Sequence, residues 1–292
     1  SESGSQSVTV TITENESAPT VTLATSTSTI AENAGSSLTL TATISQVADE
    51  NVVVTLATAG TSTNGTDYSS LSSITVTAGQ LTGTASFTPT DDSVYENDET
   101  AIISIDSVSG ADATESGTQS VTITVLADAD ATPIVTLATS NTSIAEDAGS
   151  SLTLTATLSV PTYQNVTVAL GTAGTGTEGT DYGVISDITV LAGETTGTAD
   201  FTPTDDSVYE NDETAVVSIT SVSGGSANES GTPQEVTITV TEDDDPPSFS
   251  INDVTTADES AANATFTVTL TPASGLTALV DYATSNGTAT AG

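Results

Sequence analysis

The stretch AGSSLTLTATISQVADENVVVTLAT, residues 34–58, indicates the fold of this chain. Apolar residues occupy alternate positions in two runs, at Leu38, Leu40, Ala42 and Ile44 and then at Val52, Val54 and Leu56. This alternation is typical of β-strands that bury one face, because successive side chains point to opposite faces of a strand. The positions between them are largely Thr, which is favourable on the exposed face of a strand. The stretch therefore predicts two half-buried strands joined by a polar turn.

The same stretch begins a second copy 114 residues later. AGSSLTLTAT starts at Ala34 and again at Ala148, and FTPTDDSVYENDETA occupies residues 87–101 and, letter for letter, residues 201–215. A fixed period of this kind is the signature of a repeat protein. We expect residues 1–17 to be the C-terminal strand of a preceding repeat, and the sequence to be a window of a longer array. The repeats themselves are predicted at residues 18–131 (repeat 1), 132–246 (repeat 2) and 247–292 (repeat 3, truncated).

Each complete repeat is predicted to be all-β. Repeat 1 shows no helical periodicity, and its strands are predicted at residues 20–25, 37–45, 51–58, 73–77, 83–88, 100–106 and 119–126. Seven short strands in one repeat of 114 residues are typical of a two-sheet Greek-key sandwich. Val21, Leu23, Ala85 and Phe87 are expected to join the two alternating runs in its core. A β-solenoid is disfavoured because nothing repeats at the roughly 20–30 residues of such folds.

The composition excludes most kinds of functional site. The chain has Lys+Arg 0, His 0, Cys 0 and Asp+Glu 39, for a formal net charge of −39. Nucleic-acid binding is excluded because it relies on Lys and Arg at the phosphates. The absence of Cys and His excludes disulfides, thiolate or imidazole metal ligands and Ser–His–Asp catalysis. Carboxylates, hydroxyls, amides and the backbone remain.

The carboxylates are predicted to gather at one end of each sandwich. Antiparallel strands reverse direction, so the loops after strands 20–25, 51–58 and 83–88 and the segment after strand 119–126 share an end. In repeat 1 these carry Glu32, Asp67, Asp91, Asp92, Glu96, Asp98, Glu99, Asp128 and Asp130. In repeat 2 the equivalent loops carry Glu146, Asp181, Asp205, Asp206, Glu210, Asp212, Glu213 and the run Glu242, Asp243, Asp244 and Asp245. The opposite end carries fewer acids.

Crowded carboxylates repel one another, so such an end is either fully solvated or held by cations. Ca²⁺ fits best, because it accepts several oxygen ligands in flexible geometry. Mg²⁺ demands a tighter octahedron, and Zn²⁺ prefers His or Cys. The alternative is an acidic surface adapted to brine, which would spread its acids over both ends and both sheet faces. Most exposed strand positions are Thr and Ser instead, which favours Ca²⁺ sites.

Together these motifs resemble the Calx-β domain. They are the Glu of TIAENAG, the G-T-D-Y motif, the D-D-x-x-x-E-x-D-E-T motif and the acidic run after the last strand, and VDYATSNGTATAG at residues 280–292 adds a family-like turn. The resemblance implies a seven-stranded immunoglobulin-like sandwich with several Ca²⁺ ions clustered at one pole. By position it assigns as ligands Glu32, Asp67, Asp91, Asp92, Glu96, Glu99, Asp128 and Asp130; then Glu146, Asp181, Asp205, Asp206, Glu210, Glu213, Asp243, Asp244 and Asp245; and in repeat 3 Glu259.

The expected function is structural. Connectors such as Ala131–Thr132–Pro133 are short and contain Pro, so the repeats are expected to form a rigid, Ca²⁺-stabilised stalk, adhesin shaft or filament outside a bacterial cell. The partners would be neighbouring repeats and identical chains, with no nucleic acid and no membrane insertion. An adhesin or ligand-binding module and a Ca²⁺ sensor are the alternatives. Enzymatic activity is not expected, since Trp 0 and 3% aromatic residues leave few platforms for a sugar substrate.

Overall fold

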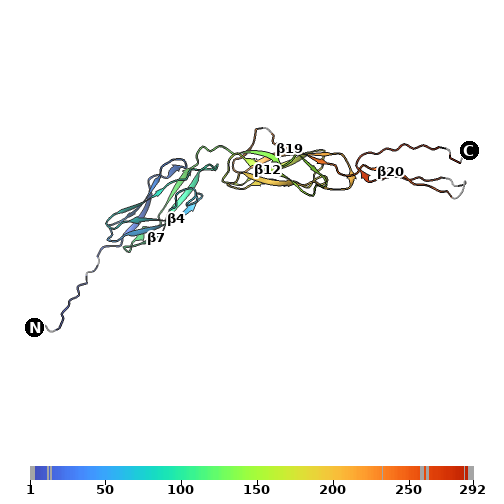
Figure 1. The fold of residues 1–292 in the computed structure, drawn as a ribbon. Coiled ribbons are helices and arrows are strands. Elements are labelled where there is room, and N and C mark those ends of the chain that lie inside the picture. The colour runs from blue at the N-terminus through green and yellow to red at the C-terminus, as the bar shows by residue number, and fades with distance from the viewer. Residues whose placement is uncertain are drawn as a thin grey trace. The chain divides into compact units, whose positions relative to one another are not determined.

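The computed structural model describes residues 4–11, 13, 15–231, 233–256, 260, 263–285 and 287–288. Among these residues every regular element is a β-strand, which confirms the predicted all-β class. The chain forms two compact units, Ser1–Asp130 and Ala131–Gly292, and each is described separately below (Figure 1).

The first unit contains two sheets that face each other across one core. One sheet has the strand order β6 (Thr82–Phe87), β3 (Leu38–Ile44), β1 (Thr20–Thr25) and β8 (Thr114–Glu115). The other has the order β2 (Thr29–Ala31), β9 (Ser120–Leu126), β7 (Glu99–Ser109), β4 (Val52–Gly60) and β5 (Ser73–Val76). Non-consecutive neighbours within each sheet are the mark of a Greek-key sandwich.

The predicted strands correspond to β1, β3 to β7 and β9, and two short strands were not predicted. The first passage of the chain is divided between the sheets: β1 pairs with β3, whereas β2 pairs in parallel with β9 of the opposite sheet. Strand β8 extends the first sheet by pairing in parallel with β1. Both are too short, at three and two residues, to show an alternating pattern in the sequence.

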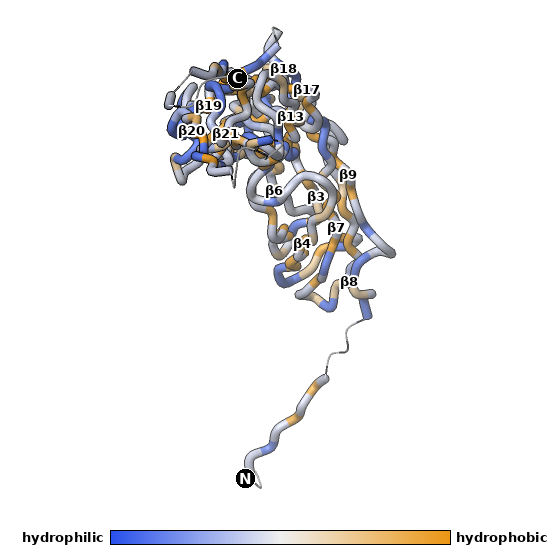
Figure 2. The backbone as a smooth tube through the Cα atoms, turned by 90° about the vertical axis from the view of Figure 1, so that its right-hand side faces the viewer, coloured by the Kyte–Doolittle hydropathy of each residue, from blue (hydrophilic) through white to orange (hydrophobic). Residues whose placement is uncertain are grey.

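The core is built from the alternating positions. Every second residue of β3 is buried, as are Val21, Val52, Val54 and Phe87, and Ala85 packs against them partly buried. Figure 2 shows the hydropathy of each residue along the backbone of these strands. Tyr68 is fully buried and stacks on Phe87 with ring centroids 4.5 Å apart. The loop that carries the acidic residue before Tyr68 is thereby anchored to the core.

The second unit repeats this arrangement and adds part of repeat 3. Its sheets have the orders β15–β12–β10–β18 and β11–β19–β17–β13–β14, and Tyr182 stacks on Phe201 at 4.9 Å. Two small sheets follow, β16–β22 and β20–β21. The bounds are β10 (Ile134–Thr139), β11 (Ser143–Ala145), β12 (Leu152–Leu158), β13 (Val166–Gly174), β14 (Ile188–Val190), β15 (Thr196–Phe201), β16 (Val208–Tyr209), β17 (Glu213–Ser223), β18 (Asn228–Glu229), β19 (Glu235–Thr241), β20 (Ser248–Ile251), β21 (Val268–Thr271) and β22 (Ala273–Ser274).

Candidate metal centre

Strand register brings four separate segments of repeat 1 to one end of the sandwich. The start of β3 lies beside the end of β6 (Leu38 opposite Phe87), and the end of β4 lies beside the start of β7 (Gly60 opposite Ala101). The end of β2 lies beside the end of β9. The β2–β3, β4–β5 and β6–β7 loops and the segment after β9 therefore meet, and we call this end the acidic pole. Repeat 2 has its own acidic pole, formed by the equivalent loops.

One group of carboxylates at the pole of repeat 1 surrounds Glu32, whose side chain is only 7% exposed. Burial, and after it the negative charges of Asp92 and Asp128, raise the pKa of Glu32 to about 7. The pKa of Asp130 is raised by desolvation and then by Asp128 and Asp92. The carboxylates of this group therefore act on one another through their negative charges.

The second group in repeat 1 consists of Asp67, Glu96 and Glu99. Burial, followed by the charges of Glu99 and Glu32, raises the pKa of Glu96 to about 7. The pKa of Glu99 is raised by burial and by Asp67, and the Ser62 hydroxyl offsets part of this rise. Oxygen Oε2 of Glu99 is buried and accepts no hydrogen bond. Since a buried polar atom normally has a partner, this unpaired oxygen fits a site that a cation completes.

Repeat 2 shows the same two groups at closer range. Oxygen atoms of Asp181, Glu210 and Glu213 all lie within 4.8 Å of one another, as do those of Glu146, Glu242 and Asp243. Burial, contact with the Asp181 carboxyl and the charge of Glu210 raise the pKa of Glu213 to about 7. Burial and the charges of Asp206 and Glu242 raise that of Glu146 to about 7.

Hydrogen bonds from backbone N–H groups to acidic side chains fix the loops that carry these groups. Asp92 Oδ1 accepts a hydrogen bond from the backbone N–H of Val94 at 2.7 Å, which shapes the β6–β7 loop. Asp98 Oδ1 accepts from the N–H of Ala127 at 3.1 Å and so joins that loop to the segment after β9. In repeat 2 the equivalent bond runs from the N–H of Glu242 to Asp212 Oδ1, also at 3.1 Å. The loop geometry is thus set by carboxylate–backbone bonds.

All the predicted ligands within the described residues lie at one of the two acidic poles. The negative charge of Asp91 helps to raise the pKa of Asp130, that of Asp205 helps to raise the pKa of Asp243, and that of Asp245 helps to raise the pKa of Asp244. Glu259 lies outside the described residues. The ligand set inferred from sequence omitted Glu242, which accepts the N–H of Glu210 at 2.5 Å and belongs to the Glu146 group. The 114-residue shift would have found it, because Glu242 is the counterpart of Asp128.

This donor set fits a hard divalent cation. The groups contain only carboxylate oxygens, and the chain has no Lys, Arg or His to neutralise them. The contact between the Asp181 and Glu213 carboxyls requires either a shared proton or a cation, because two ionised carboxylates in contact repel each other. Flexible, all-oxygen coordination from several loops is what Ca²⁺ accepts, whereas Zn²⁺ prefers nitrogen and sulfur.

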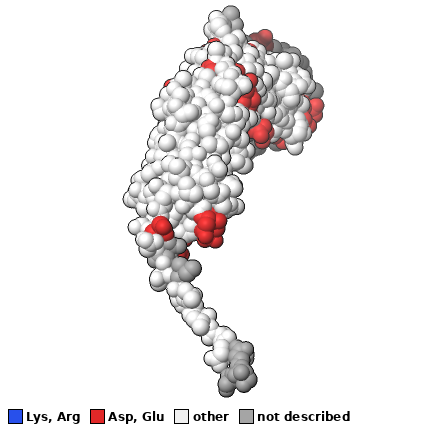
Figure 3. Space-filling model, turned by 90° about the vertical axis from the view of Figure 1, so that its left-hand side faces the viewer, with Lys and Arg blue, Asp and Glu red and all other residues white. Residues whose placement is uncertain are grey.

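Acidic side chains do not cover the molecule evenly. On the face drawn in Figure 3 they form separate patches, and most of the surface between them carries no charge. Some acids lie away from the acidic pole: Asp49, Glu50 and Asp112 line a pocket at the opposite end of repeat 1, together with Glu16. The strand faces between the two ends expose mainly Thr and Ser.

Fold and site together define a class: tandem β-sandwich repeats in which each complete repeat gathers acidic loops at one pole. The Calx-beta domain family matches residues 14–130, 128–245 and 242–292. The chain belongs to the Calx-beta domain family. This confirms the family resemblance of the sequence motifs.

Solved structures similar to this chain include other Calx domains. The crystal structure of CBD12 from CALX1.2 is 18% identical, with a TM-score of 0.31, over 74% of this chain and 96% of that chain. The apo form of the Calx CBD1 domain is 19% identical, with a TM-score of 0.32, over 38% of this chain and 99% of that chain. Escherichia coli alpha-2-macroglobulin activated by porcine elastase is 14% identical, with a TM-score of 0.23, over 82% of this chain and 24% of that chain. No curated protein matches the chain. Because these TM-scores are low, the assignment to the family rests on the family match alone.

Among the described residues no helix is long and apolar enough to span a membrane.

Proposed function

We propose that this chain belongs to a Ca²⁺-stabilised extracellular repeat protein whose tandem repeats form a rigid stalk, adhesin shaft or filament on a bacterial surface. The role of each acidic pole is to bind Ca²⁺ and so to make a charged, thinly cored sandwich stable. The repeats serve as mechanical spacers, and they have no catalytic role.

One observation carries the Ca²⁺ part of the proposal: Asp181, Glu210 and Glu213 present oxygen atoms within 4.8 Å of one another in a chain without a cationic side chain. The pKa values of Glu146 and Glu213, both raised to about 7, support this part, because burial and neighbouring negative charges oppose the ionisation of these carboxyls. A bound Ca²⁺ reverses that balance, because it stabilises the ionised form of every carboxylate that it contacts.

The proposal of a rigid stalk rests on the tandem array and on the segment that follows the last strand of each complete repeat. FTPTDDSVYENDETA recurs unchanged 114 residues apart, as expected of units that repeat one mechanical role. Asp128 and Asp130 belong to the Glu32 group of repeat 1, although they follow β9 and precede the connector. Ions at this group would therefore restrain the direction in which the chain leaves the repeat, and short Pro-containing connectors add stiffness.

The extracellular location is proposed from chemistry. A chain with Lys+Arg 0 has no cleavage site for trypsin-like proteases, and Cys 0 and Met 0 leave no sulfur to oxidise. Millimolar Ca²⁺ outside cells is also sufficient for the weaker, extracellular class of Ca²⁺ modules, with a Kd of roughly 10⁻⁴–10⁻³ M.

Removal of Ca²⁺ tests the proposal. The purified chain is examined in CaCl₂ and after EGTA, by thermal unfolding and by small-angle X-ray scattering, which measures its maximum dimension. We expect EGTA to lower the Tm and to broaden the distribution of lengths, and renewed Ca²⁺ to restore both. Unchanged Tm and unchanged length after chelation would contradict the proposal.

A further inference from the structure

Repeat 3 contacts repeat 2 through a short pair of parallel strands. Strand β16 lies in the acidic β15–β17 loop of repeat 2, and β22 follows β21 in repeat 3; Val208 is opposite Ala273, and Tyr209 is opposite Ser274. The carbonyl oxygen of Tyr209 accepts two hydrogen bonds from repeat 3, one from the N–H of Gly275 and one from the Ser274 hydroxyl, both at 3.1 Å.

The two strands are each held in place from within their own repeat. The N–H of Val208 donates to Asp206 Oδ1 at 2.7 Å, and the N–H of Glu210 donates to Glu242 Oε2 at 2.5 Å. On the other side, the N–H of Leu276 donates to the Ser274 hydroxyl at 3.0 Å. The carbonyl of Tyr209 is thus presented by a loop that is already fixed, which favours a specific contact.

Gly275 lies so close to repeat 2 that a side chain would not fit without movement. A Cβ atom at this position would lie 2.4 Å from Glu210 Oε1 and 3.2 Å from Glu210 Cδ. Gly275 is absent from the glycines with positive φ, so its backbone conformation is open to any residue. The absence of a side chain at Gly275 therefore leaves this space to the end of the Glu210 side chain.

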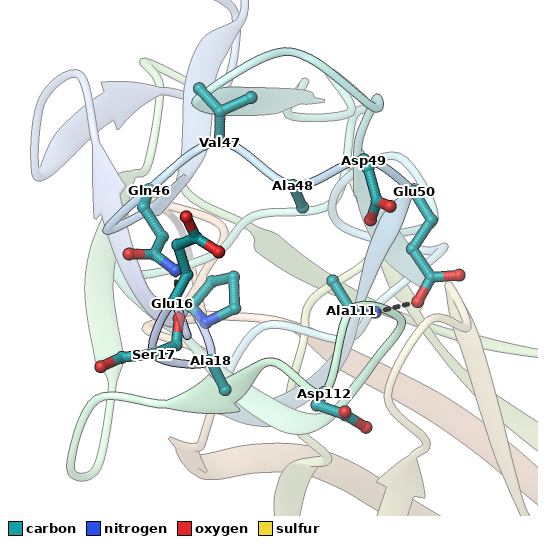
Figure 4. A pocket seen from close by; sticks show the side chains of 11 residues that line it. Glu16, Ser17, Ala18, Gln46, Val47, Ala48, Asp49, Glu50, Ala111 and Asp112 are labelled. Atoms are coloured by element: carbon teal, nitrogen blue, oxygen red, sulfur yellow. Dashed lines mark hydrogen bonds between the residues drawn. The ribbon is translucent and has the colours of Figure 1, made fainter. Parts of the chain in front are cut away.

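The equivalent turn of repeat 1 carries a side chain at this position. In repeat 1, Ile44 pairs with Val21, and in repeat 3, Leu270 pairs with Phe249 in the same way. Gly275 follows Leu270 by five residues, as Asp49 follows Ile44, so the two positions are equivalent. In repeat 1 this turn lines a pocket of about 710 Å³, in which Glu50 accepts a hydrogen bond from the N–H of Ala111 (Figure 4). The turn sequence thus differs between repeats at the residue that meets Glu210.

We propose that β16 and β22 form a docking contact between successive repeats, and that Gly275 leaves room beside this contact for the Glu210 carboxylate of repeat 2. The contact consists of main-chain pairing and steric fit. Its partner is the next repeat of the same chain, recognised by a small residue directly after β22.

Cysteine cross-linking tests this contact, because the chain has Cys 0. The variant V208C/A273C places thiols on directly paired residues, within the Cα separation of roughly 4–7 Å that a disulfide spans. The control S223C/A273C moves the first thiol to the far end of the 11-residue strand β17, which is about 30 Å long. In excess CaCl₂ we expect V208C/A273C to oxidise at least about tenfold faster, because docking raises the effective thiol concentration. Mobility in non-reducing gels and intact mass measure the product.

A second pair of variants tests Gly275. In the V208C/A273C background, G275D introduces a carboxylate against Glu210, whereas G287D makes the same change where a Cβ would meet nothing within 4 Å. We expect G275D to slow cross-linking at least about tenfold through steric and charge repulsion, and G287D to leave it unchanged. Equal rates for V208C/A273C and S223C/A273C, or for G275D and G287D, would overturn the proposal. Ca²⁺ binding by the unmodified chain is measured separately by calorimetry, so a chain that binds Ca²⁺ but does not cross-link overturns the docking contact alone.

Discussion

Glu32 and Glu194 show that position determines how a carboxyl group behaves in this protein. Glu32 is 7% exposed at the acidic pole, and burial with the nearby charges of Asp92 and Asp128 raises its pKa to about 7. Glu194 is exposed in the β14–β15 turn at the other end of its repeat, and repeat 1 has Gln80 in its place. The same residue type therefore serves as a candidate ligand at one end and as a replaceable surface group at the other.

The first prediction concerns pH. The pKa of Glu32 and that of Glu146 are both raised to about 7 in the folded, metal-free chain, so between about pH 4.5 and pH 7 the folded state binds more protons than the unfolded state. Proton uptake by these two carboxyls therefore stabilises the folded state fully below about pH 4.5, their pKa in the unfolded state. This stabilisation is lost as the pH rises through about 7, their pKa in the folded state. In EGTA we expect the Tm to fall as the pH is raised through this window. In saturating Ca²⁺ we expect a rise, because the ions displace the protons. A Tm that rises with pH in EGTA would contradict the raised pKa values.

The second prediction concerns Glu213. The variant E213Q removes one charge from the Asp181–Glu210–Glu213 group, so it is expected to raise the Tm of the EGTA-treated chain slightly. In Ca²⁺ the same variant loses a ligand, and the affinity of repeat 2 is expected to fall at least about tenfold. Titration calorimetry and thermal unfolding measure the two effects. The matched control E194Q should change neither, and a loss of stability in both conditions would argue for a purely structural role of Glu213.

At the scale of the element, the ends of β4 and β13 position the loops that carry Asp67 and Asp181. Gly60 has φ 112°, and a Cβ there would lie 2.1 Å from the carbonyl oxygen of Thr100. Gly174 repeats this geometry against Thr214, with φ 120° and the same 2.1 Å. The strand can therefore turn towards the acidic pole only where its last residue has no side chain.

The third prediction compares two glycines of repeat 1. Gly79 also has positive φ, at 79°, but a Cβ there would meet nothing within 4 Å. We expect G79A to cost roughly 1–2 kcal/mol of unfolding free energy through backbone strain alone. G60A should cost about 1–3 kcal/mol more, because strand β7 must move as well. Chemical denaturation in Ca²⁺ measures both values, and equal costs would show that the contact with Thr100 does not constrain the β4–β5 loop.

At the scale of the whole molecule, the charge must be compensated by the solution. The chain carries Asp+Glu 39 against Lys+Arg 0, so no ion pair between side chains can offset the repulsion. Dissolved salt screens such charges in general, whereas a bound divalent ion acts only where carboxylates converge. The two effects distinguish specific Ca²⁺ sites from a surface that is adapted to brine.

The fourth prediction compares salts at equal ionic strength. In EGTA, added NaCl is expected to raise the Tm gradually, because it screens the net charge of −39. CaCl₂ at matched ionic strength should raise the Tm by several degrees more, and above the Kd the rise should follow the logarithm of the Ca²⁺ concentration, as linked binding requires. MgCl₂ is the control for valence, since Mg²⁺ tolerates irregular oxygen cages poorly. Coincident curves for the three salts would contradict specific Ca²⁺ binding.

Much of this protein follows from local sequence patterns. Period-two alternation in residues 38–44 and 52–56 reports which face of a strand is buried, because side chains alternate whatever the strand pairs with. The 114-residue recurrence and the alternation of loops between the two ends then predict that the candidate ligands of repeat 1 lie at one pole. The amino-acid sequence was therefore sufficient for the all-β class, the tandem organisation and the family resemblance.

Tertiary structure decided which backbone groups and side chains meet. The transfer of β2 to the second sheet, the role of Glu242 beside Glu146, and the pairing of β16 with β22 all depend on register between segments far apart in the chain. Short strands and single carboxylates leave no periodic signal, and their partners are set by how two sheets and their loops pack in three dimensions. The strands could be predicted from the sequence because their pattern involves neighbouring residues. These contacts could not, because they join residues that are far apart in the sequence and come together only in the folded protein.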